Sequence, residues 1–204
     1  MRIASNELFA VLTAISFAAG LNVYATVATI GLLAHTGMFP LPPDLQLLTN
    51  WYVIGCCVVL FLVELFADKI PVFDLLWNAL HTFVRVPVAA LLAYRATAQL
   101  SPGWQLTATL LGGAIALAAH SGKTAVRAAV TPSPEPISNV ALSVGEDALA
   151  VFLTWFATRH PYWAAGVSAA LVLAVVVLMG WVVRALAGML RRARREVSLI
   201  FGGV

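Results

Sequence analysis

The chain has 204 residues, of which 61% are hydrophobic and 10% charged, with a formal net charge of +3. Soluble domains contain roughly 45–50% apolar residues, so this composition excludes an ordinary soluble domain and indicates a membrane protein. The adjacent cysteines Cys56 and Cys57 lie in an apolar run without a CxxC pattern, and we expect them to be small apolar residues of a helix.

The apolar segments, taken in chain order, predict an all-α polytopic membrane bundle. A bilayer core about 30 Å thick needs about 20 apolar residues per helix. The six expected spans are residues 8–34, 51–67, 72–95, 104–121, 138–157 and 162–187, separated by Pro-rich or polar turns. Residues 1–190 would form one transmembrane domain, and residues 191–204, which contain the run RRARRE, a basic tail.

Basic residues predict the orientation of the bundle, because they are enriched in cytoplasmic loops. The basic tail should be cytoplasmic, and six spans then place the N-terminus there too. The inner connections would hold Lys69, Lys123 and Arg127, and the outer ones only Arg95 and Arg159. We therefore expect a multi-pass membrane protein with both termini inside. The tail would meet anionic lipid, not nucleic acid.

A short internal similarity has two interpretations. LLAHTG, which contains His35, ends the first span, and LAAHSG, which contains His120, ends the fourth. The same offset aligns the second span with the fifth and the third with the sixth. A 3+3 inverted repeat would be typical of transporters, whereas chance similarity is the default for so short an apolar match.

Polar residues recur on single faces of the expected helices, at about 100° per residue. In the third span the stripe ends at Arg85, about 20 Å from the helix start, and Pro87 should kink the helix just beyond it. The sixth span has no such stripe and should face lipid. The stripes are Asn22, Thr26 and Thr29; Glu64 and Asp68; Asp74, Asn78, His81 and Arg85; His120, Lys123 and Arg127; and Asn139, Ser143, Glu146, Asp147 and Thr154.

Charges inside a bilayer cost about 2.5–3.5 kcal/mol each on insertion scales, so these side chains should face the bundle interior and pair. We expect a shared polar cluster open to the cytoplasm, in which Arg85 pairs with Glu64, Glu146 or Asp147. The alternative is that the pairs only fix the helices together, which we favour for Asp68 and Lys69 beside their tight turn. No HxxxH pattern is present, and nearby basic residues argue against a hard-cation site, so we expect no metal and no cofactor.

Three sequence stretches resemble a known family. ADKIPVFDLLWNALHTFVR, AHSGKTAVRAA and the order N…S…GED are similar to an uncharacterised family of bacterial integral membrane proteins described as domain of unknown function 4126, over about residues 8–160. The family pattern places a proline after Asn139, where this chain has Val140. The resemblance implies a compact multi-helix protein of the bacterial cytoplasmic (inner) membrane but no substrate. It implies a polar signature of Asp68, Lys69, Pro71, Asp74, His81, Arg85, His120, Lys123, Arg127, Asn139, Ser143, Glu146 and Asp147.

These features favour a small transporter or lipid flippase over an enzyme. An anionic or lipid-linked substrate would bind Arg85, Lys123, Arg127, His81, His120 and Asn22, and a coupling proton or cation would bind Glu146, Asp147, Glu64, Asp68 and Asp74. Because the chain is small, we expect a homodimer, in which two copies together enclose the path of the substrate.

Two other functions remain open. A structural or assembly subunit would use the charges to pair helices or partners, and a dry, fully paired core would favour it. A membrane enzyme acting on lipid is the weakest interpretation, because the sequence has no nucleophile elbow, HExxH or aspartate-rich pyrophosphate motif.

Overall fold

The computed structural model describes residues 5–67, 71–130 and 136–201, and all of its regular elements are helical, which confirms the predicted all-α class. The elements are α1 (Ser5–Leu21), α2 (Val23–His35), the short 3₁₀ helix η1 (Pro43–Thr49), α3 (Trp51–Ala67), α4 (Pro71–Ala96), α5 (Pro102–Val130), α6 (Pro136–Arg159) and α7 (Pro161–Phe201). The last five predicted spans each lie within one helix. Helix α4 continues through Pro87, and α7 continues into the predicted tail.

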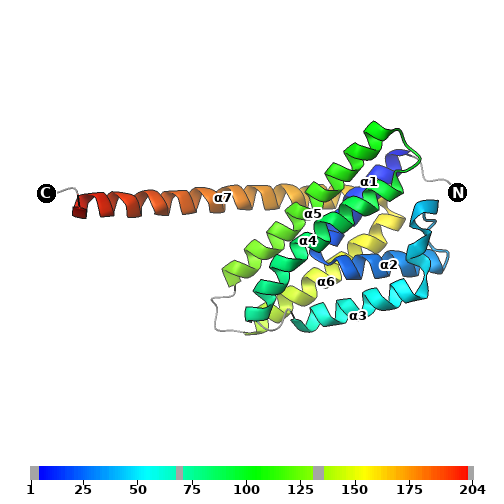
Figure 1. Cartoon of the computed structure of the whole chain (residues 1–204), viewed down its shortest axis with the longest axis horizontal. Coiled ribbons are helices and arrows are strands. Elements are labelled where there is room, and N and C mark those ends of the chain that lie inside the picture. The colour runs from blue at the N-terminus through cyan, green and yellow to red at the C-terminus, as the bar shows by residue number, and fades with distance from the viewer. Residues whose placement is uncertain (1–4, 68–70, 131–135, 202–204) are drawn as a thin grey trace.

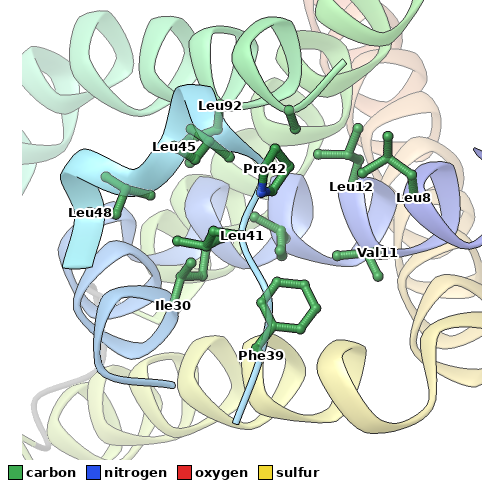
Figure 2. Close-up of a pocket in the computed structure, with 12 residues that line it drawn as sticks. Leu8, Val11, Leu12, Ile30, Phe39, Leu41, Pro42, Leu45, Leu48 and Leu92 are labelled. Atoms are coloured by element: carbon green, nitrogen blue, oxygen red, sulfur yellow. The ribbon is translucent and has the colours of Figure 1, made fainter. Parts of the chain in front are cut away.

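The first predicted span, residues 8–34, is not one helix. It is interrupted at Asn22, whose backbone is extended (φ −149°, ψ 104°). Leu8 of α1 and Ile30 of α2 line the same small apolar pocket (Figure 2), although a continuous helix would separate them by about 33 Å. Helices α1 and α2 therefore fold back on one another as a re-entrant hairpin with its tip at Asn22.

Helix α1 is the centre of the molecule. Most of its side chains are buried, and α4, α5, α6 and α7 all pack against it (Figure 1). It approaches α5 closely at Gly20, where an added Cβ would lie 2.4 Å from the backbone oxygen of Ala116. Small residues of this kind let helix backbones approach closely in a membrane bundle.

The two ends of the bundle can be assigned from packing. Leu12 of α1 clusters with Ala96 near the end of α4 and Ala108 near the start of α5, so α1 begins at the end of the bundle where α4 finishes. Helix α7 runs alongside α1 toward the tip, since Ala164 packs near Ala14 and residues further along pack beside the tip, and it then projects beyond the other helices (Figure 1). The first and last described residues thus lie at opposite ends of the bundle (Figure 1). The sequence analysis expected residues 8–34 to be one crossing, whereas in the structure they turn back at Asn22.

Two described helices are long and apolar enough to cross a membrane, Val140–Arg159 and Pro161–Met189, and η1 with α3 would be a third although the pair is bent by 64°. The polar stripes of α4 and α5 lower the hydropathy of those helices. The described structure is thus consistent with a membrane protein but does not confirm six spans.

The inverted repeat is also not confirmed. Residues 104–121 lie in one unbroken helix, whereas residues 8–34 are interrupted. His120 is buried and its counterpart His35 is exposed.

Candidate functional site

Charged side chains from α3, α4, α5 and α6 meet in the bundle interior. Glu64 forms an ion pair with Arg85, and its Oε1 lies 3.6 Å from Nζ of Lys123. That ammonium lies 3.4 Å from Oε2 of Glu146, which in turn lies 2.6 Å from Nη2 of Arg127. We call these five residues the charge chain, because cations and carboxylates alternate along it in the order Arg85, Glu64, Lys123, Glu146, Arg127.

The charge chain is buried deeply at one end and less deeply at the other. The side chains of Arg85, Glu64 and Lys123 have 0% exposure, against 7% for Arg127 and 13% for Glu146. The predicted pairing of Arg85 with an acid is confirmed, and its partner is Glu64. Among the described residues the charge chain is paired and mostly buried, whereas the sequence analysis expected a polar cluster open to the cytoplasm.

Hydrogen bonds determine the role of His120. Nη1 of Arg85 lies 2.8 Å from Nδ1 of His120, and a guanidinium only donates. Nδ1 therefore accepts, so the ring is neutral and its Nε2–H donates to the hydroxyl of Thr82 at 2.7 Å. His120 thus holds the buried end of the charge chain in place.

His81 links α4 to the re-entrant hairpin. Its Nδ1 lies 2.8 Å from the carbonyl oxygen of Trp77 and must donate to it. In the neutral ring Nε2 then accepts from the hydroxyl of Tyr24, 3.1 Å away on α2. His81 is a hydrogen-bonding group between two elements in this conformation.

Charged side chains also hold both helix ends at the hairpin tip. Nζ of Lys123 donates to the carbonyl oxygen of Leu21, the last residue of α1, at 3.2 Å. The side chain of Asn22 caps α2 by accepting from the backbone N–H of Ala25, and its Nδ2 donates to Oδ1 of Asp147 at 2.8 Å. A cation therefore meets the negative end of the α1 dipole, and a carboxylate lies beside the positive end of the α2 dipole.

Beside the tip, a groove of about 550 Å³ separates α3 from α6. Its walls include Phe61 and Leu65 of α3 and Val144, Phe152 and Trp155 of α6. Asp147 is part of the lining. The groove thus brings an apolar surface to a carboxylate that holds the hairpin tip.

The structure brings together most of the residues that the sequence selected: Asn22, Glu64, His81, Arg85, His120, Lys123, Arg127, Glu146 and Asp147. Asp68 lies outside the described residues, and Asp74 lies in α4 with its side chain outside them. Sequence reasoning missed the contributions of Tyr24 and Thr82. Tyr24 lies off the stripe of its helix, whereas Thr82 lies four residues after Asn78, at the edge of the stripe, where helical spacing could have found it. In the described ranges no group of three His, Cys, Asp or Glu residues could hold a metal ion.

The family match covers all of these residues. A family model described as "Domain of unknown function (DUF4126)" matches residues 9–184. The chain belongs to this family. No curated protein and no solved structure matches the chain. The match supports the resemblance seen in the sequence, and because the family's description states no activity, a functional proposal must come from the chemistry of the site.

Proposed function

We propose that this protein is a small membrane transporter for an anion, either free or as part of a lipid-linked substrate, and that Glu64 and Glu146 couple its movement to protons. The observation that carries the proposal is the re-entrant hairpin, whose interrupted helix ends lie against Lys123 and Asp147 inside the bundle. Transporters commonly bind substrates and ions at such half-helix ends, whereas packing alone does not require a broken helix there.

The charge chain supports a competition between proton and anion. Arg85, Lys123 and Arg127 are held by two carboxylates. Protonation of a carboxylate removes its charge and releases its basic partners, which can then bind an anion. Oε2 of Glu64 is buried and has no hydrogen-bond partner within the described ranges, so it is the oxygen at which we place the added proton. Loss of the proton would restore the ion pairs and expel the anion.

We further propose five crossings, α3 to α7, with the re-entrant hairpin entering from the outer side of a bacterial inner membrane. Helices α4 and α5 can cross despite their charged residues, because those side chains face the bundle interior and not the lipid. The basic tail would be cytoplasmic and the N-terminus outside, which keeps Lys123 and Arg127 at the inner side and Arg95 and Arg159 at the outer side. The 3+3 repeat is not part of this proposal. Because the chain is small, we also propose a homodimer, in which the second copy helps to enclose the path of the substrate.

A structural or assembly role is the second candidate, and a specific observation favours it. Each cation of the charge chain has a carboxylate within 4 Å, and its inner members are fully buried. Buried ion pairs are retained in some proteins to specify helix arrangement. Under this candidate no anion would displace the carboxylates.

The variants Glu64→Gln and Glu146→Gln distinguish the two candidates, because each mimics a protonated carboxylate at nearly constant shape. Under the transport proposal, phosphate, sulfate or succinate should raise the melting temperature of the detergent-purified variants more than that of the parent at neutral pH. In liposomes Glu146→Gln should lose proton-coupled anion movement. Glu7→Gln, near the start of α1, is the matched control.

The structural candidate predicts the opposite pattern. Removal of one partner of a buried pair is expected to cost about 3–5 kcal/mol of stability under either candidate, but under the structural candidate none of the three anions would restore it. That result would contradict the transport proposal.

A further inference from the structure

We infer that the tip of the re-entrant hairpin is a binding site for one monovalent cation, and that the ammonium of Lys123 occupies this site as a cation tethered to the chain. The ligand class of the site is a primary ammonium ion. The inference deepens the proposed function and rests on it only where transport is concerned, because the binding itself is tested without any movement of an anion.

At least three oxygens from three helices lie around Nζ of Lys123. The carbonyl oxygen of Leu21 on α1 lies 3.2 Å away and accepts a hydrogen bond. Oε1 of Glu64 on α3 lies 3.6 Å away, and Oε2 of Glu146 on α6 lies 3.4 Å away, so both carboxylates act through charge more than through short hydrogen bonds. The Lys123 side chain has 0% exposure. The ammonium therefore has the oxygen ligands of a buried cation.

The end of a broken helix is a place where proteins bind cations. The last carbonyls of a half-helix carry the negative end of its dipole, and transporters coordinate cations at such ends. Leu21 is the last residue of α1. Its position is fixed against α5, because the preceding Gly20 packs closely on Ala116 and Ala119, one turn before Lys123. Helix packing thus holds the carbonyl where the ammonium meets it.

Charge and distance favour a monovalent ammonium over a metal ion. Without Lys123 the described side chains around the tip would carry one net negative formal charge, which one monovalent cation would neutralise. The oxygens lie 3.2–3.6 Å from Nζ, whereas Ca²⁺ takes about six to eight oxygens at about 2.3–2.6 Å. The groups that balance with Lys123 present are the basic Arg85, Lys123 and Arg127 and the acidic Glu64, Glu146 and Asp147.

The tether has a consequence for coupling. A free Na⁺ or K⁺ could cross the membrane with the substrate, whereas the ammonium of Lys123 stays on α5. The hairpin tip thus has its positive charge without a free cation, which is consistent with the proton as the coupling ion. The parent protein should therefore melt at the same temperature, and move its anion at the same rate, in sodium, potassium or choline chloride of equal ionic strength.

Chemical rescue tests the site in the full chain. Lys123→Ala removes the side chain beyond Cβ, and the lost group has the size and charge of propylammonium. The melting temperature of the detergent-purified variant would be measured with propylammonium chloride, propanol or tetramethylammonium chloride. We expect propylammonium to raise it by about 3–6 °C at about ten times the dissociation constant. Propanol has no charge and tetramethylammonium has no N–H donor, so neither should raise it.

Lys123→Met is the matched control, because it removes the charge but fills the space with an apolar side chain. Propylammonium should raise the melting temperature of neither this variant nor the parent. Lys123→Ala would also be extracted from membranes with and without propylammonium. If the variant does not fold without the amine, we expect it to be recovered folded in the amine and to unfold when the amine is removed.

Four results would overturn the inference. Equal stabilisation of Lys123→Ala by propanol or tetramethylammonium would mean that the site does not select an ammonium. An equal response of Lys123→Met would place the amine elsewhere. A Lys123→Ala variant that ignores the amine, or stays unfolded in it, would show that these oxygens do not form a cation site. A parent whose melting temperature depends on Na⁺ or K⁺ would mean that Lys123 does not replace the free cation.

Failure of the proposed function would give a different result. A parent that moves no anion in liposomes under any of these salts would contradict transport. The melting experiments would still decide whether the hairpin tip is a cation site, because they require no transport.

Discussion

At the scale of single residues, the alternation of charge explains how so many ionisable groups can lie inside an apolar bundle. Glu64 is shared by Arg85 and Lys123, and Glu146 by Lys123 and Arg127. A buried carboxylate is costly alone, but each one here has two basic neighbours. Loss of one member therefore affects its partners as well as its own contacts.

A double-mutant cycle should measure this coupling at the buried end. We expect Arg85→Ala and Glu64→Ala each to cost about 3–5 kcal/mol of unfolding free energy, because each leaves a buried charge without its main partner. The double variant should cost clearly less than the sum, since Lys123 still has Glu146 within 3.4 Å. Unfolding in detergent gives the four free energies, and simple additivity would show that the two groups are not coupled.

Much of the charge chain could be predicted from the sequence, and the contacts at the tip could not. Helical spacing places His81 and Arg85 on one inward face, and the cost of a deep cation requires an acid partner for Arg85. The bond between Asn22 and Asp147 depends instead on where the first span turns back. Periodicity describes the faces of a helix and does not show where a helix ends inside an apolar run.

At the scale of elements, the re-entrant hairpin is the feature that most changes the expected architecture. Residues 8–34 have the length and hydropathy of one crossing, and so average properties could not reveal the turn. The local signals were Gly20, which weakens a helix, and Asn22, a favoured N-cap residue in an apolar run. Gly20 has a second role, because it lets α1 approach the backbone of α5 at Ala116.

Gly20→Ala tests this approach. The added methyl would lie 2.4 Å from a backbone oxygen and 2.7 Å from Cβ of Ala119, so α1 must move away from α5. We expect a loss of about 1–3 kcal/mol, as for overpacked cores, measured by unfolding in detergent. The control is Gly55→Ala on α3, where the added Cβ meets no atom within 4 Å from the other described parts of the chain. The close packing of α1 on α5 would be wrong if both variants were as stable as the parent.

At the scale of the whole molecule, residues 8–34 turn back, and the two ends of the described chain lie at opposite ends of the bundle (Figure 1). In the proposed topology α3 to α7 supply the five crossings. The distribution of basic residues fits this topology nearly as well as it fits six spans, because only the N-terminus, which carries Arg2, changes side. Charge counting alone therefore could not distinguish the two.

The side of the N-terminus is the most direct test of the re-entrant hairpin. In a variant with Cys56 and Cys57 replaced by alanine, single cysteines would be placed at positions 5, 101 and 191 and labelled in intact cells with a membrane-impermeant maleimide. We expect labelling at positions 5 and 101, and labelling at position 191 only after permeabilisation. If position 5 were labelled only after permeabilisation while position 101 reacted in intact cells, residues 8–34 would cross the membrane as one span, and the re-entrant hairpin would be contradicted.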